Sequence, residues 1–367
     1  MAKRVRKHGQ VVDVIQNDMS DIRNVDEHLN ILTEGLVEDK IVIDSGSTFE
    51  NWDLICDFCS KGLKKLEENV EKKGEYEEIY SMVFLPASHF LAFEAKIKYP
   101  NTKWIAEFSD PVLYDEKGVL RYSKINDPEF INKVNTLLSE HNLPEYHDDN
   151  LLLLCEYLPY AFADEIVFTN ENQKTHMMDY FPILGISEIV EKKAKVRDHI
   201  TLSKEFYYLF ESDYLVDDNY VNIAYFGRDY ETRNLNDIFY ALDEIDDEYK
   251  NRCKIHIFTY NVRQFRKSIE HLPIADYLEI NPYIRFLEFL NLTTKFDCLI
   301  VNDAQKKGRI NPFLPSKLSD YMGSGTDIWG LYEENSTLSK IDLRYKSIIG
   351  DIESSKQILK QIIEDHS

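Results

Sequence analysis

The sequence predicts an α/β protein with two doubly wound domains, and three observations support this prediction. The chain has 367 residues, more than one hydrophobic core usually organises. Hydrophobic residues make up 43% and aromatic residues 13% of it, which is enough for two packed cores. Short apolar, β-branched or aromatic runs alternate with helical stretches, and this alternation occurs in two series separated by a charged segment.

The predicted strands follow one another in these two series. Stretches with helical periodicity separate the runs, so the strands should pair in parallel through right-handed crossovers. The runs of the first series are residues 11–16, 40–44, 79–85, 103–108 and 165–170. Those of the second series are residues 221–227, 254–260, 297–303 and 327–333.

The domain boundary is expected within residues 183–220, where charged segments do not continue the strand pattern. We therefore predict an N-terminal domain over residues 1–190, a C-terminal domain over residues 191–350, and a final helix within residues 351–367. Ligands of open α/β sheets bind beyond the carboxyl ends of the strands. With two such domains, the cleft between them is the expected site.

The net charge of −22 limits the classes of partner. A phosphate backbone requires a basic surface, so we expect no nucleic-acid partner, and any anionic ligand has to be held by a few local cations. The basic "KRVRK" at residues 3–7 would give at most a weak contact with a membrane surface and fits a solvated helix end better. The sequence has neither an apolar run of about 18 residues nor a signal peptide, which favours a cytoplasmic protein.

Five cysteines, an odd number spread along the chain, fit a reducing compartment. The close pair is Cys56 and Cys59, in a segment with the periodicity of an amphipathic helix. This spacing occurs in redox motifs and in half of a zinc site, but no second Cys/His pair completes a tetrahedral set. Packing in the core is the preferred interpretation of both thiols.

The loop after residues 221–227 has the pattern of an anion site. Gly227 ends the run, Arg228 follows it, and Arg233 lies at the start of the predicted helix "NLNDIFYALDEI". Free amide groups and the dipole at a helix start attract anions, and the planar fork of arginine suits a diphosphate. Surface arginines near turns are common, so an ordinary turn also fits this motif.

The stretch "RINPFLPSKLSDYMGSGTDIW", residues 309–329, contains a second motif. Lys317 lies between a proline-rich turn and a short predicted helix, and Asp320 follows it by one turn. This arrangement suits a phosphate and a hydroxyl, although an ordinary connection with a solvated lysine fits the stretch equally well. Together with Arg228 and Arg233, Lys317 would bring three cations to the carboxyl edge of one sheet.

With these two motifs, the C-terminal half resembles the nucleotide-sugar-binding domain of GT-B glycosyltransferases. The resemblance is to the large retaining family, family 4, that includes sucrose-synthase-like and cell-wall polysaccharide glycosyltransferases. It implies two Rossmann-like domains facing a cleft, with Lys317 neutralising the donor phosphates and Asp320 holding ribose hydroxyls. The matching residues are Gly227, Arg228, Arg233 and Asn234 in the first motif and Ser316, Lys317, Asp320, Gly323 and Gly325 in the second.

The N-terminal half is similar to the acceptor-side domain of that family, in "WIAEFSDPVLYD" and "ADEIVFTNENQKTHM". The family's fold implies that residues 351–367 pack back towards the first domain. The chain departs from the family because it opens in a helix, so that the first strand of the N-terminal domain is expected to be absent. Ser109 precedes Asp110 where many relatives have a histidine, and Pro312 stands where many have an acidic partner for Asp320.

Asp110 and His89 are the candidates for catalysis in the N-terminal half. Asp110 lies at the carboxyl end of a predicted strand and before a proline, where a turn former fits equally well. His89 lies beside apolar residues, and a hydrogen-bonded structural histidine is the more common case there. The acidic cluster at residues 243–249 fits a solvated helix end, so we predict neither a metal site nor a cofactor.

The resemblance implies a hexosyltransferase-like enzyme that moves a sugar from a nucleotide diphosphate donor to a glycan, lipid-linked or protein-linked acceptor. The setting would be cell-surface polysaccharide synthesis, with retention of configuration and with cations in place of a metal at the leaving group. Peripheral association with the inner face of the membrane and homo- or hetero-oligomers stay open. The alternative is a non-catalytic GT-B partner or chaperone subunit of an active glycosyltransferase, which the missing first strand favours.

Overall fold

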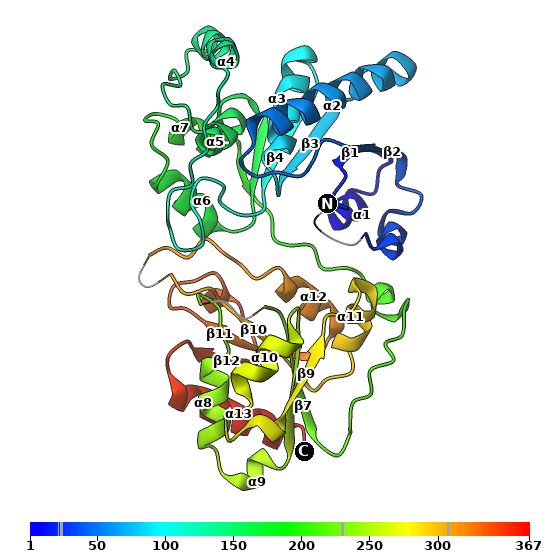
Figure 1. The fold of residues 1–367 in the computed structure, drawn as a ribbon, viewed down its shortest axis with the longest axis vertical. Helices are drawn as coiled ribbons and strands as arrows, with labels where there is room; N and C mark the ends of the chain where they lie inside the picture. Colours follow the sequence, from blue (N-terminus) through cyan, green and yellow to red (C-terminus); the bar gives the residue numbers. More distant parts are fainter. Residues whose placement is uncertain (21, 23–24, 229–230, 307–308) are drawn as a thin grey trace. The chain divides into compact units, whose positions relative to one another are not determined.

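The computed structural model describes residues 1–20, 22, 25–228, 231–306 and 309–367 (Figure 1). It divides into two compact units, Met1–Asp198 and His199–Ser367. The sequence placed this boundary at residues 190 and 191. Strand β6 (Ala194–Val196) belongs to the first unit, however, because it pairs in parallel with β5 (Glu165–Phe168). The predicted α/β architecture with two Rossmann-like units is confirmed.

The second unit has a parallel sheet whose strand order, in the described residues, is β12-β11-β10-β7-β8-β9. The order reverses between the neighbours β7 and β10, and the loops that leave two such strands diverge and open a site. The strands are β7 (Val221–Phe226), β8 (Cys253–Thr259), β9 (Leu278–Pro282), β10 (Cys298–Asn302), β11 (Asp327–Tyr332) and β12 (Tyr345–Ile348). The helices are α8 (Asn236–Glu244), α9 (Asp247–Lys250), α10 (Val262–Ile269), α11 (Phe286–Thr293), α12 (Lys317–Ser324) and α13 (Ile352–Asp365), with short 3-10 helices η2 (Lys204–Tyr208), η3 (Ala275–Tyr277) and η4 (Leu338–Lys340).

Strand β7 occupies the middle of this sheet because nearly its whole sequence is apolar. Every residue of "VNIAYF" is buried. Ile223 and Tyr225 pack into the main core of the unit, while Phe226 stacks on Phe258 of β8 with ring centroids 4.5 Å apart. Burial on both faces is typical of a central parallel strand, which helices cover from both sides.

The C-terminal helix α13 packs within the second unit. Leu359, Ile362 and Ile363 recur at helical spacing and are buried in its core, against α8 and β12. The Lys360 ammonium donates to Asp246 at 2.7 Å. The apolar stripe of this helix is thus buried within its own unit, and the expectation that residues 351–367 pack back towards the first domain stays a prediction.

The first unit has two parallel sheets in its described residues, ordered β1-β2 and β3-β4-β5-β6. Its remaining strands are β1 (Val12–Asn17), β2 (Val37–Ile43), β3 (Glu78–Val83) and β4 (Lys103–Phe108). Its helices are α1 (Ala2–His8), α2 (Trp52–Lys73), α3 (Ala87–Lys98), α4 (Pro128–Glu140), α5 (Leu151–Phe162), α6 (Glu171–Asp179) and α7 (Ser187–Lys193), with the 3-10 helix η1 (Glu27–Thr33).

The two sheets of the first unit share a layer of helices. Ile15 of β1 packs with Phe58 of α2 and Leu91 of α3, and α3 also contacts the strands β3 and β4. Tyr76, just before β3, donates a short hydrogen bond to Asp13 at the start of β1. Strands β1 and β3 are still not paired with each other in the part of the chain that the structure describes, so the sheet is in two parts.

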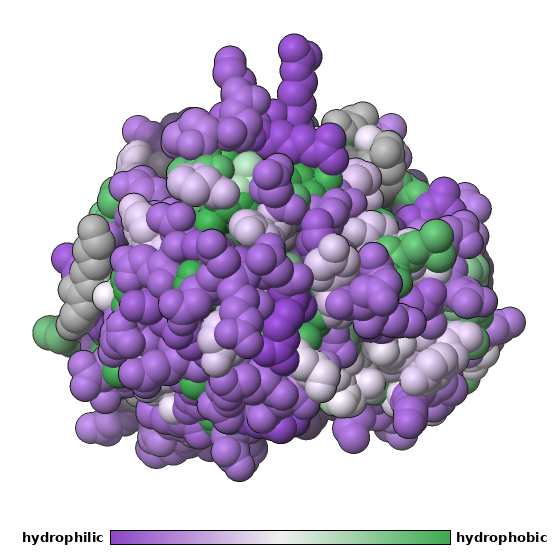
Figure 2. All heavy atoms as spheres, turned by 90° about the horizontal axis from the view of Figure 1, so that it is seen from below, coloured by the Kyte–Doolittle hydropathy of each residue, from purple (hydrophilic) through white to green (hydrophobic). Residues whose placement is uncertain are grey.

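The outer surface is mainly hydrophilic where Figure 2 shows it. Hydrophobic residues form small separate areas on that face. Scattered apolar side chains are ordinary on a protein surface in water, and here charged residues make up 29% of the chain.

Candidate functional site

The loop after β7 begins with Gly227 and Arg228, as the sequence predicted. A Cβ at Gly227 would lie 2.6 Å from the hydroxyl oxygen of Tyr225, so the glycine lets the loop turn closely over that ring. The Tyr225 hydroxyl donates to the carbonyl oxygen of Arg228 at 3.1 Å. The exposed Arg228 guanidinium lies over the ring of Tyr260, 4.7 Å from its centroid.

Arg233 lies a few residues before α8 and is half-buried. Two hydrogen bonds hold the backbone on either side of it. The backbone N–H of Gln305 donates to the backbone carbonyl oxygen of Thr232 at 2.7 Å. The side-chain amide of Asn302 donates to the backbone carbonyl oxygen of Asn234 at 2.9 Å. Both donors belong to β10 or its loop, so the strand order fixes Arg233 beside the carboxyl end of β10.

Lys317 is the first residue of α12, preceded by the exposed Ser316. Burial lowers the pKa of its ammonium group, and the positive charge of Arg233 lowers it further, while Asp320 acts in the opposite direction. Two cations that influence each other in this way lie close together at a cost in free energy, because like charges repel. An anion bound between them would remove that cost.

Helix α12 is anchored by Tyr207, whose hydroxyl donates to the carbonyl oxygen of Asp320 at 2.6 Å. A Cβ at Gly323 would lie 2.1 Å from that hydroxyl, so a glycine is required for the close approach. The Asp320 side chain is 5% exposed. Gly325 ends the helix with φ near 79°, in the left-handed region that favours glycine.

The three cations share a second property. Among the described residues, neither Arg228, Arg233 nor Lys317 forms an ion pair with a carboxylate, although the chain carries a net charge of −22. Other Lys and Arg residues do pair with carboxylates, such as Lys360 with Asp246. Unpaired cations at the carboxyl edge of a doubly wound sheet are suited to an anionic ligand.

Two acidic residues at the same edge were not singled out from the sequence. Asp303 follows β10 and Glu333 follows β11, and the N–H of Glu333 donates to Asp303 Oδ2 at 3.1 Å. Burial raises the pKa of Asp303 to about 6. Glu333 in turn accepts from the N–H of Lys306 at 2.7 Å and from the Asn311 amide at 3.0 Å. The signal that could have found them is an acidic residue directly after an apolar strand.

His89, a candidate for catalysis, lies inside the first unit with no exposed surface. Its Nδ1 is 2.9 Å from the Ser81 hydroxyl, which accepts from the Trp104 indole N–H at 2.8 Å. Burial lowers the pKa of His89 to about 3, so the ring is neutral. A buried, neutral imidazole packed edge-on against Phe108 favours the structural interpretation, and the catalytic role of His89 stays a prediction.

Asp110 lies just beyond the carboxyl end of β4 and is exposed. The loop that follows it is held by Glu156 of α5, whose Oε1 accepts from the backbone N–H groups of Val112 at 2.7 Å and Leu113 at 2.8 Å. Burial raises the pKa of Glu156 to about 7, although these hydrogen bonds lower it. The catalytic role of Asp110 stays a prediction.

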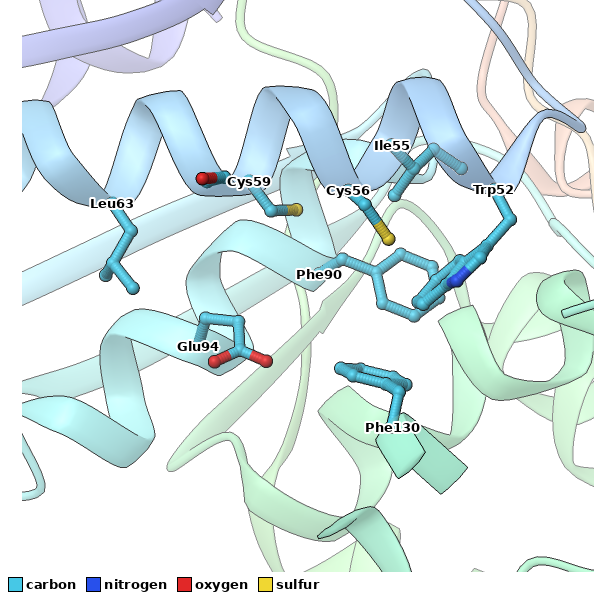
Figure 3. A pocket seen from close by; sticks show the side chains of 9 residues that line it. Trp52, Ile55, Cys56, Cys59, Leu63, Phe90, Glu94 and Phe130 are labelled. Atoms are coloured by element: carbon cyan, nitrogen blue, oxygen red, sulfur yellow. The ribbon is translucent and has the colours of Figure 1, made fainter. Parts of the chain in front are cut away.

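A cavity of about 220 Å³ opens between α2, α3 and α4 (Figure 3). Cys56 and Cys59 line it together with Trp52, Phe90 and Phe130, as expected for thiols that pack in an apolar setting. Burial raises the pKa of Cys56 to about 11, so this thiol stays protonated. Neither Lys nor Arg is among the described residues that line the cavity. The one acid that lines it, Glu94, is paired with Lys133.

In the ranges that the structure describes, no helix is long and apolar enough to cross a membrane. No group of three or more His, Cys, Asp or Glu side chains in the same ranges could hold a metal ion.

The comparison with solved structures places this fold among GT-B proteins. A mutant of S. aureus TarM in complex with fondaparinux, α-GlcNAc-glycerol and UDP matches with TM-score 0.52 and 11% identity, over 85% of this chain and 52% of that one. WaaG, a glycosyltransferase involved in lipopolysaccharide biosynthesis, matches with TM-score 0.51 and 9% identity, over 99% of this chain and 85% of the WaaG chain. A putative UDP-N-acetylglucosamine 2-epimerase from Listeria monocytogenes matches with TM-score 0.50 and 12% identity, over 99% of this chain and 83% of the epimerase chain.

These likenesses show the fold and no more, because the identities are far below the level at which function is shared. The chain spans about half the length of the TarM structure. Neither the scan against protein-family models nor the search of curated proteins found a match.

Proposed function

We propose that the chain is a glycosyltransferase that moves a sugar from a nucleoside diphosphate donor to a glycan or glycan-precursor acceptor. The observation that carries this proposal is the set of unpaired cations at the carboxyl edge of the second unit. Arg228, Arg233 and Lys317 would hold the diphosphate and stabilise the charge that develops on it as the sugar leaves. The GT-B fold, found in glycosyltransferases such as WaaG, supports the proposal as an analogy.

In this proposal three further residues of the second unit also contribute to donor binding. Asp320 accepts hydrogen bonds from ribose hydroxyls, Ser316 donates to a phosphate oxygen, and Gly227 leaves room for the donor beside the β7 loop. Asp110 of the first unit acts on the acceptor. Because three cations supply the charge, the reaction would need no metal ion and no cofactor, and the anomeric configuration would be retained, as the resemblance implies.

The acceptor would be a glycan, lipid-linked or protein-linked, in cell-surface polysaccharide synthesis. This places the protein in the cytoplasm, at the inner face of the membrane where such acceptors are built. Nucleic acid is not a partner, since the net charge of −22 opposes a phosphate backbone.

Titration calorimetry with uridine and guanosine diphosphates, with and without a chelator, tests the proposal. We expect binding of at least one nucleotide that survives chelation. Lys317→Ala should weaken it roughly ten- to a hundredfold, about 1.5–3 kcal/mol, because a charge-assisted hydrogen bond to phosphate is lost. Lys317→Arg should restore part of the affinity, since a planar fork replaces a compact ammonium.

The matched control is Lys254→Ala. Lys254 lies near the amino end of β8, at the opposite edge of the same sheet, and pairs with Glu279 at 3.5 Å. This variant should bind nucleotide as the wild type does. Equal affinities for Lys317→Ala and wild type would leave an ordinary solvated lysine as the better interpretation.

A second candidate function is that of a non-catalytic GT-B partner or chaperone subunit. It is favoured by the division of the first unit into two sheets and by the burial of His89. Incubation with nucleotide sugars and analysis of the products separates the candidates. Transfer to an acceptor supports the enzyme, whereas nucleotide binding without any product supports the partner.

A further inference from the structure

Asp303 has a place at the candidate site that the proposed roles do not use. It is the first residue after β10, and its side chain is 1% exposed. Oδ2 accepts from the backbone N–H of Glu333 at 3.1 Å. Oδ1 is buried and has no hydrogen-bond partner among the described residues. A buried carboxylate oxygen without a partner is costly, so its surroundings need an explanation.

The nearby cation is Arg233, whose charge acts on the Asp303 carboxylate. Arg233 Nε is itself buried and has no partner in the described ranges. The fold therefore places an unsatisfied donor of one charge and an unsatisfied acceptor of the other in the same buried region. A bridging water is one way in which such groups become paired.

The backbone around the two residues shows that this arrangement is specific. The carbonyl oxygens of Thr232 and Asn234, on either side of Arg233, accept from Gln305 and Asn302, which flank Asp303. Two bonds of 2.7 and 2.9 Å thus hold the backbone at Arg233 beside the backbone at Asp303. Neither side chain has to reach across an unsupported loop.

We propose that Asp303 is a positioning residue, which holds Arg233 through its Nε side and leaves the terminal N–H groups of the guanidinium for the diphosphate of the donor. This inference rests on the proposed function for its ligand, but not for the Asp303–Arg233 contact itself. A guanidinium held in this way loses less conformational freedom on binding, and its fork meets two phosphate oxygens in a fixed orientation. Lys317 is the other cation that acts with Arg233.

The sign of one measurement decides between this role and plain electrostatics. Asp303 lies close to an anion site, so removing its negative charge should strengthen anion binding if charge alone matters. If the carboxylate positions Arg233, its removal should weaken binding. Asp303→Asn is suitable because asparagine keeps an oxygen that can accept from Glu333, and the thermal midpoint checks that the fold is kept.

The experiment is a double-mutant cycle read by calorimetry with uridine diphosphate at pH 8, where the terminal phosphate is fully ionised. We expect Asp303→Asn to lower the affinity about three- to tenfold in the wild-type background and less than about twofold in Arg233→Ala, since nothing is left to position. In Lys317→Ala the loss should persist. Asp297→Asn is the matched control: Asp297 accepts from the backbone N–H of Asn222 at 2.7 Å, at the opposite end of β10.

A ligand-free readout separates this inference from the proposed function. In protein labelled with 15N-arginine, the Nε–H signal of Arg233, assigned by its loss in Arg233→Lys, should exchange slowly with water, and Asp303→Asn should make that exchange at least about tenfold faster. Unchanged exchange, tighter nucleotide binding by Asp303→Asn, or the same loss in both backgrounds would each overturn the positioning role. Slow Nε–H exchange that depends on Asp303, without nucleotide binding by the wild type, would sink the proposed function and leave the contact standing.

Discussion

The two units of this protein have related sheets that differ at one position. In the second unit β7 lies between β10 and β8, and all of its residues are buried. In the first unit β1 pairs with β2 and β3 pairs with β4, with no ladder between β1 and β3 in the described residues, and no residue of β1 is fully buried. In the second unit the central strand β7 therefore joins the two halves of the sheet. In the first unit helices and side chains connect the two separate sheets.

This difference bears on where a ligand site can form. The β7 loop carries Gly227 and Arg228 at a switch point, because β7 has a neighbour on each side and the two crossovers diverge there. The first unit has Asp110 beyond β4, inside a run of neighbouring strands where no such divergence occurs. The comparison is consistent with a ligand site at the carboxyl edge of the second unit, where Arg228 follows β7.

The largest expected effect is in native-state hydrogen exchange. The amides of β7 should open only when the whole second unit unfolds, whereas β1 pairs only with β2 in the part of the chain that the structure describes. We expect a difference of about 4 kcal/mol in opening free energy, roughly a thousandfold in exchange. Mass spectrometry of peptides covering residues 12–17 and 221–226 measures it, and equal protection of both would mean that the helices alone make the first unit continuous.

The second effect concerns the core of the first unit. His89→Ala should lower the free energy of unfolding of that unit by about 3 kcal/mol, because it leaves a cavity and removes the partner of Ser81. Nucleotide binding, assigned to the second unit, should not change. Denaturant unfolding in a Trp329→Phe background reports the first unit, since Trp52 and Trp104 then give the fluorescence. A variant that keeps its stability and loses transferase activity would support the catalytic role of His89.

The third effect is a dependence of stability on pH. Burial raises the pKa of Glu156 to about 7 from its ordinary value of 4.5, so the folded first unit binds a proton more tightly than the unfolded chain. The stability from this group is complete below pH 4.5 and is lost as pH rises through 7, by about 3 kcal/mol in total. Glu156→Gln should remove this dependence, and unfolding curves at pH 5 and pH 8 test it. A steeper loss in the variant would contradict the assignment.

The smallest effect is at the exposed end of the site. Arg228→Ala should weaken nucleotide binding about two- to fivefold, or about 0.5–1 kcal/mol, because an exposed guanidinium over Tyr260 is screened by water. Lys317→Ala should cost more, since Lys317 is partly buried. Calorimetry at two salt concentrations measures both variants, and a larger loss for Arg228→Ala would show that the exposed part of the β7 loop dominates.

Most strands were predictable from the sequence because each contains a short apolar, β-branched or aromatic run between helical stretches. β7 and β10 are buried at every position, and hydrophobic runs of this kind are recognisable without any neighbour. β6, β9 and β12 were missed. β9 and β12 alternate buried with exposed positions, and β6 has no fully buried residue, so whether they form strands depends on the edge beside which the chain places them.

The sequence by itself determined the alternation of strands and helices in two units and the loops that carry Gly227, Arg228 and Lys317. These features follow from local periodicity and from spacing along the chain. The tertiary structure decided that His89 is buried, that α13 packs on its own unit, and that Asp303 lies beside Arg233. The physical reason is that burial and pairing depend on which loops the strand order brings to the same edge, and residues as distant in sequence as Arg233 and Asp303 meet only because β7 and β10 are neighbours.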